Sequence, residues 1–283
     1  MKIMKFKYFS INLISLWLIA LATIPLLLIL ITSFLAHDDS HLILWHFTLS
    51  NYVYFFHPIY FKILWLSLKL SVNCTILCLL IGYPAAFIIA RSHGSLKNLF
   101  LLLMIIPFWT SSLIRTYAIL TILKTKGLLN SALLALGIIH HPIQLIYTNT
   151  AVLVAVVYNL LPFMIFPLYS NIEKLDTRLL DAARDLGAGK IKIFKAIILP
   201  LTMPGIMAGT LLVFRPAMTL FYIPVLVGGA KSLLLGNLVE SQFLEMHNWP
   251  GGAATSIVLT LFMLLLIFIY TRFARGKQRQ ELL

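Results

Sequence analysis

Polar side chains that could do chemistry are concentrated in one stretch of this apolar chain, residues 176–200. Asp176 is placed to cap a helix, because an aspartate carboxylate accepts N–H groups that the first helical turn leaves free. Leucine and alanine then recur at helical spacing, and Gly187 stands where such a helix would end, since glycine adopts the left-handed conformation at no steric cost. The stretch predicts a helix–turn–helix on a membrane surface, with small residues where another protein could approach closely.

This stretch does not carry nucleotide chemistry. Gly189-Lys190 looks like the end of a phosphate-binding loop, but Ile191 replaces the Ser or Thr that holds Mg²⁺. Arg184 stands where the first glycine of such a loop is required. The stretch is therefore not expected to bind ATP, and any ATP hydrolysis that this chain depends on would take place on a separate chain.

The remaining residues offer no catalytic or metal-binding set. None of the eight histidines begins an HExxH motif or forms a spaced ligand set with cysteine. Cys74 and Cys78 lie four apart in an apolar segment, which places them on one helix face rather than in a CxxC site. We expect no catalytic residue, no cofactor and no metal, and a membrane enzyme is the least supported class.

Composition identifies an integral membrane protein. Of the 283 residues, 60% are hydrophobic and only 11% are charged, far from the balance of a soluble domain. The formal net charge of +13 does not indicate nucleic acid, because the 22 lysines and arginines lie mostly in short clusters beside apolar runs. The first apolar run continues to Leu35, longer than a cleaved signal, so we expect membrane lipid to surround a retained first helix.

Apolar runs of ~20 residues are needed to cross a bilayer, since each helical residue adds ~1.5 Å. The segment at 127–141 is too short and is expected to be a surface or re-entrant helix. The segment at 37–60 is expected to be a polar loop outside the membrane. The sequence predicts six spans, at about 11–36, 61–90, 98–122, 148–172, 199–223 and 252–271.

Charge distribution predicts the topology. Fifteen of the lysines and arginines lie on the side that carries the termini and the 176–200 loop, four lie on the other side and three within spans. The positive-inside rule therefore places both termini and the loop in the cytoplasm. We expect an all-α integral membrane fold with an N-terminal helix and outer loop (1–60), a five-helix core (61–275) and a cytoplasmic tail (276–283).

Charged residues within the spans are few. All nine Asp and Glu lie outside the interiors of the spans, which argues against an ion-coupled carrier, because proton or sodium coupling usually uses buried carboxylates. A cation crossing here would meet aromatic faces and carbonyls. Lys69 is expected to extend to the outer interface. Arg115 and Arg215 are either structural anchors or pathway residues.

Pro107 and Pro216 lie inside predicted spans and are candidate bending points around a pathway. Nearby aromatic side chains could hold a cation by cation–π contacts, or could be packing and interface aromatics. The polar loop at 224–251 could dock a substrate-delivering protein, with Glu240, Glu245 and Trp249 as candidates. The candidate pathway residues are Trp109, Arg115, Tyr117, Tyr158, Phe163, Arg215 and Tyr222.

The 176–200 loop resembles a motif in the membrane subunits of bacterial binding-protein-dependent ABC importers. That motif reads E-A-A, three residues, G, nine residues, I, one residue, L-P. Both spacings match here, and the one departure is aspartate for glutamate, a carboxylate that reaches one methylene less far. The matching residues, which the resemblance assigns to ATPase coupling, are Asp181, Ala182, Ala183, Gly187, Ile197, Leu199 and Pro200.

The resemblance extends over about residues 50–270, through PFWTSSLIRTYAIL, LPFMIFPLYSNIEKLD, ILPLTMPGI and WPGGAATSI, to the spermidine/putrescine importer permeases. It implies a type I importer permease fold in the bacterial inner membrane. It also implies a second, non-identical permease, two copies of a cytoplasmic ATPase and a periplasmic binding protein that captures polyamine. Arg215 departs from the family, which is apolar there. Sulfate, iron, thiamine or phosphonate remains an alternative cargo for the same fold, and an ion-coupled carrier is a further alternative.

Overall fold

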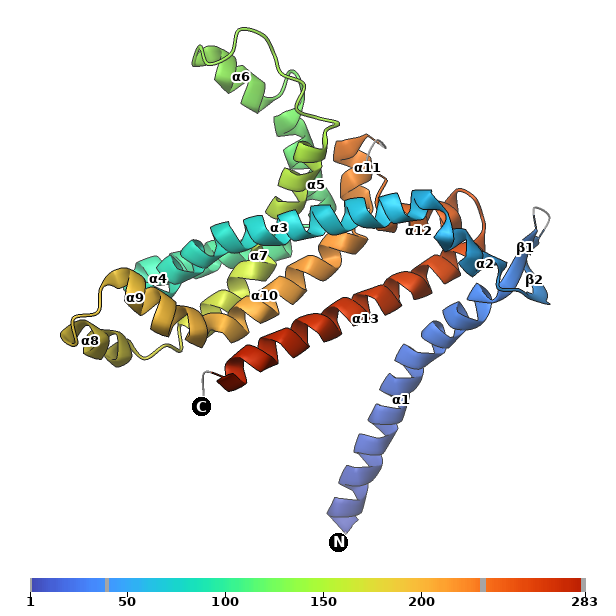
Figure 1. Cartoon of the computed structure of the whole chain (residues 1–283), viewed down its shortest axis with the longest axis horizontal. Helices are drawn as coiled ribbons and strands as arrows, with labels where there is room; N and C mark the ends of the chain where they lie inside the picture. The colour runs from blue at the N-terminus through green and yellow to red at the C-terminus, as the bar shows by residue number, and fades with distance from the viewer. Residues whose placement is uncertain (1, 39–40, 230–232, 281–283) are drawn as a thin grey trace. The chain divides into compact units, whose positions relative to one another are not determined.

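The computed structural model describes residues 2–38, 41–229 and 233–280 (Figure 1). Asp39, Lys231 and the last three residues of the predicted tail lie outside the described residues. A 3₁₀ turn, Tyr54–Phe56, precedes α3, and a π-helical turn, Phe194–Ile198, joins α9 to α10. The elements are α1 (Lys2–Ser33), β1 (Leu35–Asp38), β2 (His41–Phe47), α2 (Ser50–Val53), α3 (Pro58–Arg91), α4 (Gly94–Trp109), α5 (Ser112–Leu123), α6 (Leu128–Ala135), α7 (Asn149–Ile172), α8 (Thr177–Asp185), α9 (Lys190–Ile193), α10 (Leu199–Thr219), α11 (Tyr222–Gly228), α12 (Leu235–Leu244) and α13 (Trp249–Gln280).

Among the described residues, six helical segments are long and apolar enough to cross a membrane. The prediction of an all-α membrane fold with six spans is confirmed. The one sheet in the described parts is the small β1–β2 hairpin. The six segments are Leu13–Ser33, Pro58–Arg91, Ser112–Ala135, Asn149–Ile172, Lys190–Thr219 and Trp249–Arg272.

Contacts divide the chain into two compact units. The first comprises the described parts of Met1–Lys62 and Leu238–Ile269, and the second those of Ile63–Asn237 and Tyr270–Leu283. The division into 1–60, 61–275 and 276–283 stays a prediction.

In the first unit, the loop at 37–60 is more ordered than its polar composition predicted. β1 and β2 pair antiparallel, and the buried side chain of Asn51 ties them to the end of α1. Its Nδ2 donates to the carbonyls of Ser33 at 3.0 Å and Leu35 at 2.8 Å. These bonds satisfy carbonyls that a helix end leaves free.

The core of the second unit is built around α7, a mostly apolar helix that is about half buried by its neighbours. It contacts α4, α5, α10 and α11. One face repeats every fourth residue and is fully or almost fully buried, through Val152, Val156, Leu160, Met164, Leu168 and Ile172.

Three helices meet at Met164. A Cβ on Gly209 of α10 would lie 2.6 Å from Met164 Sδ, and a Cβ on Gly82 of α3 would lie 3.1 Å from Met164 Cγ. One turn away on α10, a Cβ on Gly205 would lie 3.0 Å from the Pro167 carbonyl oxygen. Gly205 and Gly209 are four apart, the small-residue spacing that lets membrane helices pack backbone to backbone.

The third span predicted at 98–122 is wrong in its bounds. Two helices occupy that region, α4 and α5, and the backbone between them is extended at Thr110 and Ser111. Pro107 cannot donate a hydrogen bond to the preceding turn, and α4 ends two residues later. The apolar segment long enough to cross instead starts at Ser112 and includes α6, the short helix expected near 127–141.

The fifth span predicted at 199–223 is also shifted. The helix begins at Lys190, runs through the π-helical turn and ends at Thr219. Pro200 lies inside this helix and does not begin it. The π-helical turn directly before Pro200 shifts the hydrogen-bond register where the proline has no N–H to give.

Gly209→Leu is expected to destabilise the second unit, because the added side chain would overlap Met164 and the α7 backbone. Overpacking of this kind costs about 1–3 kcal/mol or more. Ala208→Leu is the matched control, since Ala208 is the exposed neighbour on the same helix. Thermal unfolding in detergent should give a lower Tm for Gly209→Leu but not for Ala208→Leu. The double variant Gly209→Leu/Met164→Ala should regain part of the lost Tm. Equal Tm values for the two leucine variants would contradict the packing.

Candidate functional site

The loop singled out by the sequence, Asp176–Pro200, is built on α8. Asp176 Oδ1 accepts a hydrogen bond from the Arg178 N–H at 2.9 Å. This is the predicted N-cap, and it is confirmed.

The C-terminal end of α8 closes on Gly187, whose φ is +77°. The Gly187 N–H donates to the Arg184 carbonyl at 2.8 Å, and the Ala188 N–H donates to the Ala183 carbonyl at 3.0 Å. The two bonds form a Schellman motif, which satisfies carbonyls that the helix end would otherwise leave free. The turn at Gly187 is therefore confirmed, and both ends of α8 are set by local chemistry.

One face of the loop is anchored. α8 turns two side chains inward, and Phe87 of α3 packs against the cluster they form with the following helix. Burial of this apolar face holds α8 to the membrane helices rather than leaving it free in solvent. The buried residues of the cluster are Leu180, Ala183, Ile193 and Ile198.

The other face of the loop is open. Asp181 and Ala182 are exposed, and so are three apolar side chains that the sequence did not predict to be exposed. Leu186 is 88% exposed, and Leu179 and Ile191 are also mostly exposed. Apolar side chains held out of the core next to a polar rim are typical of a protein contact surface.

Within this open face, Asp181 Oδ1 pairs with Arg184 Nη1 at 2.8 Å. Both side chains are largely exposed, so the pair adds little stability and leaves the carboxylate accessible to another protein. Ile197, Leu199 and Pro200 are half-buried where the loop joins α10.

An ion pair joins α4 to the end of α7 just before the loop. Lys97 Nζ lies 2.5 Å from Glu173 Oε1. The hydrogen bond from Lys97 holds the pKa of the Glu173 carboxyl below its ordinary value. The carboxylate therefore stays ionised at neutral pH and below.

At membrane depth, a polar cluster links three helices of the second unit. Ser112 of α5 contacts Tyr222 of α11 at 2.5 Å, oxygen to oxygen, and donates to Asn159 Oδ1 of α7 at 2.8 Å. Asn159 Nδ2 donates to Thr116 Oγ1 at 3.3 Å and to the Ala155 carbonyl at 3.0 Å. Thr116 Oγ1 donates back to the Ser112 carbonyl at 2.8 Å.

The direction of each bond in this cluster follows from the donors available. Ser112 has one hydroxyl proton and gives it to Asn159 Oδ1, which can only accept. Tyr222 must therefore donate to Ser112. Sequence reasoning found Tyr222 but missed Ser112, Thr116 and Asn159; their signal was polar side chains inside apolar stretches.

The cluster lies where two helices are interrupted. Ser112 begins α5 after the break that follows α4, and Tyr222 begins α11 after the break that follows α10. The helices before these breaks, α4 and α10, end two and three residues after a proline, Pro107 or Pro216. The expected bending points are therefore helix ends, and the bond between Ser112 and Tyr222 brings both breaks together.

Arg115 belongs to the same region. Its Nη1 lies 3.4 Å from the Asn159 carbonyl, a long contact, and its Nε is buried without a partner. The structure thus brings Arg115 and Tyr222 together through Asn159 and Ser112.

The remaining candidate pathway residues are not gathered into one site. Phe163 packs edge-on against Phe108, with ring centroids 5.1 Å apart, as a core aromatic would. Trp109 is 82% exposed at the end of α4. The other exposed members are Tyr117, Tyr158 and Arg215.

The candidate docking residues lie in the first unit. Glu240 is half-buried on α12, whereas Glu245 is exposed beyond the end of that helix. Trp249 begins α13 and packs edge-on against Phe243. Among the described residues, no group of three His, Cys, Asp or Glu side chains could hold a metal ion.

The profile of the family described as binding-protein-dependent transport system inner membrane component matches residues 79–279. This chain belongs to that family. As such an inner membrane component, it is a multi-pass protein of the inner membrane and a transport subunit, not an enzyme.

This inner membrane component is similar to the spermidine/putrescine transport system permease protein PotB of Haemophilus influenzae, with 52% identity over 95% of this chain and 94% of that one. It is 51% identical to PotB of Escherichia coli over 92% of this chain and 94% of that one. Its fold resembles a chain in the crystal structure of a bacterial ABC transporter for the acidic polysaccharide alginate, with a TM-score of 0.75, 15% identity, and 97% and 96% of the two chains covered.

Glu173→Gln is expected to lower the Tm of this inner membrane component at pH 7. The pKa of Glu173 is lowered in the folded protein, so the Lys97–Glu173 pair stabilises the wild type at pH values above the ordinary glutamate pKa. This stabilisation is lost as the pH falls through the lowered pKa of Glu173. The difference in Tm between variant and wild type should therefore shrink with acidification. Lys97→Gln/Glu173→Gln should be no less stable than either single variant, and an additive loss would contradict the pairing.

Proposed function

We propose that this chain is one of two membrane subunits of an ATP-driven, binding-protein-dependent importer of polyamines. The observation that carries the cargo is the identity of about half of all residues, over nearly the whole chain, with permeases named for spermidine and putrescine. The implied partners are a second permease, two copies of a cytoplasmic ATPase and a periplasmic binding protein. Both termini and the Asp176–Pro200 loop lie in the cytoplasm, as the positive-inside rule predicts.

The open face of the Asp176–Pro200 loop is the ATPase contact in this proposal. Leu186 and Ile191 offer apolar area, and Asp181 offers a carboxylate that is accessible despite its pairing with Arg184. The opposite face is packed on Phe87 of α3 and on α9 with the π-helical turn that continues into α10, so a force applied to α8 would act on the membrane helices. The motif residues Ala182, Ala183, Gly187, Ile197, Leu199 and Pro200 shape this contact.

The chemistry at the two helix breaks suits a polycation. A helix C-terminus carries a partial negative charge and free carbonyls, and interrupted membrane helices use such ends to hold cations. α4 and α10 both end at the breaks beside the Ser112–Tyr222 bond, and Trp109, at the end of α4, is exposed for a cation–π contact. Tyr117, Tyr158, Phe163, Arg115 and Arg215 remain candidate pathway residues.

The proposed contact with the binding protein lies on α12, just beyond its end and at the start of α13. Glu245 is exposed and Trp249 is partly so, while Glu240 is half-buried. We assign these three residues to contact with the binding protein.

Uptake of radiolabelled spermidine and putrescine in proteoliposomes tests the cargo. The vesicles would hold this chain, its partner permease and the ATPase, with and without ATP and binding protein. We expect ATP-dependent uptake that disappears when this chain is omitted. ATP hydrolysis stimulated by binding protein without polyamine uptake would keep the mechanism and reject the cargo, and uptake driven by an ion gradient alone would overturn both.

Gly187→Val is expected to reach the membrane in normal amount yet abolish uptake. Valine at φ +77° is strained, so the Schellman turn and the open face would be distorted. The readouts are membrane abundance, co-purification of the ATPase and uptake.

Two glycines provide matched controls for Gly187→Val. Gly189→Val changes a loop glycine with φ −69° and open space around it, and Gly94→Val imposes the same kind of strain, at φ +58°, outside the loop. Both are expected to retain more than half of wild-type uptake. If Gly187→Val bound the ATPase and imported substrate normally, the assignment of this loop to ATPase coupling would be wrong.

A further inference from the structure

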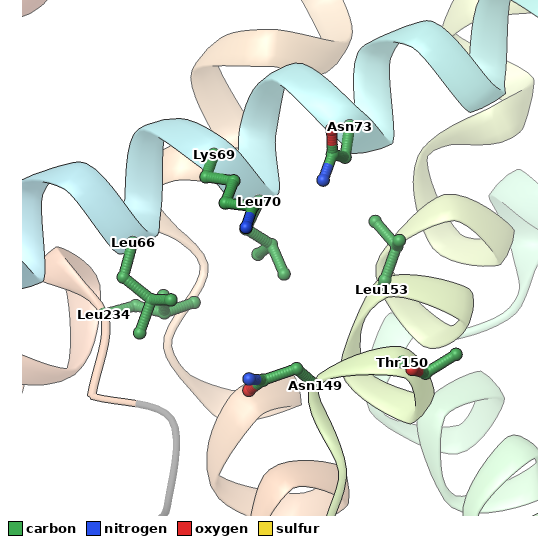
Figure 2. Close-up of a pocket in the computed structure, with 8 residues that line it drawn as sticks. All are labelled: Leu66, Lys69, Leu70, Asn73, Asn149, Thr150, Leu153 and Leu234. Carbon is green, nitrogen blue, oxygen red and sulfur yellow. The ribbon is translucent and has the colours of Figure 1, made fainter.

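A cavity of about 230 Å³ lies between α3 and the first turn of α7 (Figure 2). Its polar lining comes from Lys69 and Asn73 on α3 and from Asn149 and Thr150 on α7. Four leucines form the rest of the lining: Leu66, Leu70, Leu153 and Leu234. The combination of one cation, several hydrogen-bonding groups and an apolar wall fits an anionic amphiphile.

The walls of this cavity are fixed. The Leu235 N–H donates to the buried Ser67 Oγ at 2.9 Å, which holds the adjacent Leu234 against α3. Thr148 Oγ1 accepts from the Ala151 N–H at 3.1 Å and caps α7. The Ala151 N–H is thereby occupied, which leaves the Thr150 N–H of the same first turn beside the cavity.

Lys69 supplies the charge. In Figure 2 its side chain and that of Asn73 extend toward the start of α7. Within the described part of the chain, Lys69 pairs with no carboxylate. An ammonium at this depth is costly unless it reaches an anion or water.

The depth of the cavity follows from helix length. Lys69 and Arg91 are 22 positions apart on α3, and no charged residue lies between them. This spacing corresponds to about 33 Å of helix, close to the ~30 Å of a bilayer's hydrocarbon core. α3 and α7 run in the same direction, because Cys78 contacts the Val157 carbonyl and Gly82 contacts Met164. The start of α7 therefore lies at the depth of Lys69, at the hydrocarbon boundary opposite the Asp176–Pro200 loop.

We propose that this cavity binds the phosphate headgroup of an anionic phospholipid. Lys69 and Asn73 hold the phosphate together with the Thr150 hydroxyl and N–H, and the acyl chains lie along Leu66, Leu70 and Leu153. Phosphate groups of the bilayer are concentrated at this depth, which favours lipid over a free anion. The site is distinct from the pathway and does not depend on which solute is imported.

Native mass spectrometry of the assembled importer, titrated with phosphatidylglycerol or phosphatidylcholine, tests the site. Lys69→Gln should weaken phosphatidylglycerol binding about fivefold, the effect of one basic residue at a lipid surface, and leave phosphatidylcholine binding unchanged. Lys69→Arg should bind as wild type does. Lys62→Gln is the matched control, a lysine of the same helix outside the cavity, and should change the affinity less than twofold.

Asn73→Asp is a second variant that leaves Lys69 in place. Its carboxylate would neutralise the ammonium and repel phosphate, so phosphatidylglycerol binding should fall at least as far as in Lys69→Gln. If Lys69→Gln does not assemble into the importer, Asn73→Asp tests phosphatidylglycerol binding at the cavity in its place. Wild-type affinity in either variant would overturn the proposal.

Competition distinguishes a lipid from a free anion. Inorganic phosphate at millimolar concentration should not displace phosphatidylglycerol, because it lacks the apolar contacts. Displacement by phosphate alone would make this a simple anion site and overturn the lipid assignment. Because lipid binding is measured without uptake, these outcomes are independent of the polyamine result.

Discussion

The structure of the second unit depends on the approach of α3 and α10 to Met164. In a bilayer, helices gain little from hiding apolar side chains from each other, because lipid is as apolar as they are. Close packing must supply the attraction instead, and it requires space at the contact. Gly82 and Gly209 provide that space on two sides of one flexible thioether. α7 is thereby held between α3 and α10, and its ends carry the capped start at Thr148 and the Lys97–Glu173 pair.

On the buried side of α7, polar groups must find partners on neighbouring helices. Asn159 is the example: its amide reaches α5 and its own preceding turn, and Ser112 carries the chain on to Tyr222. The breaks beside this cluster are tolerated because side chains help to satisfy the free carbonyls, as Thr110 does for Pro107 at 3.1 Å. Interrupted helices and a buried polar cluster are therefore parts of one arrangement.

Much of this architecture could be predicted from the sequence, where local chemistry decides the outcome. Runs of apolar residues predicted the number of spans, and Asp176 and Gly187 predicted both ends of α8, because a cap and a left-handed turn need no distant partner. The break at Thr110 and the helix that continues through Pro200 could not be placed, since proline permits either result and neighbouring helices decide. The packing role of Gly82 and Gly209 could not be predicted, because it depends on Met164 of another helix lying between them. The hydrogen bond from Asn51 to Ser33 likewise joins residues far apart in the sequence.

The helix that begins at Lys190 and ends at Thr219 has a mechanical consequence. Its 30 residues form a rod of about 45 Å, with the loop at one end and the break at Leu220 at the other. Tilting such a rod by about ten degrees around one end carries the other end ~8 Å sideways, by its length alone. A small rotation where this helix meets the loop therefore becomes a much larger displacement at its opposite end. The π-helical turn and the prolines Pro204 and Pro216 inside the helix are the places along this lever arm where bending or torsion could be absorbed.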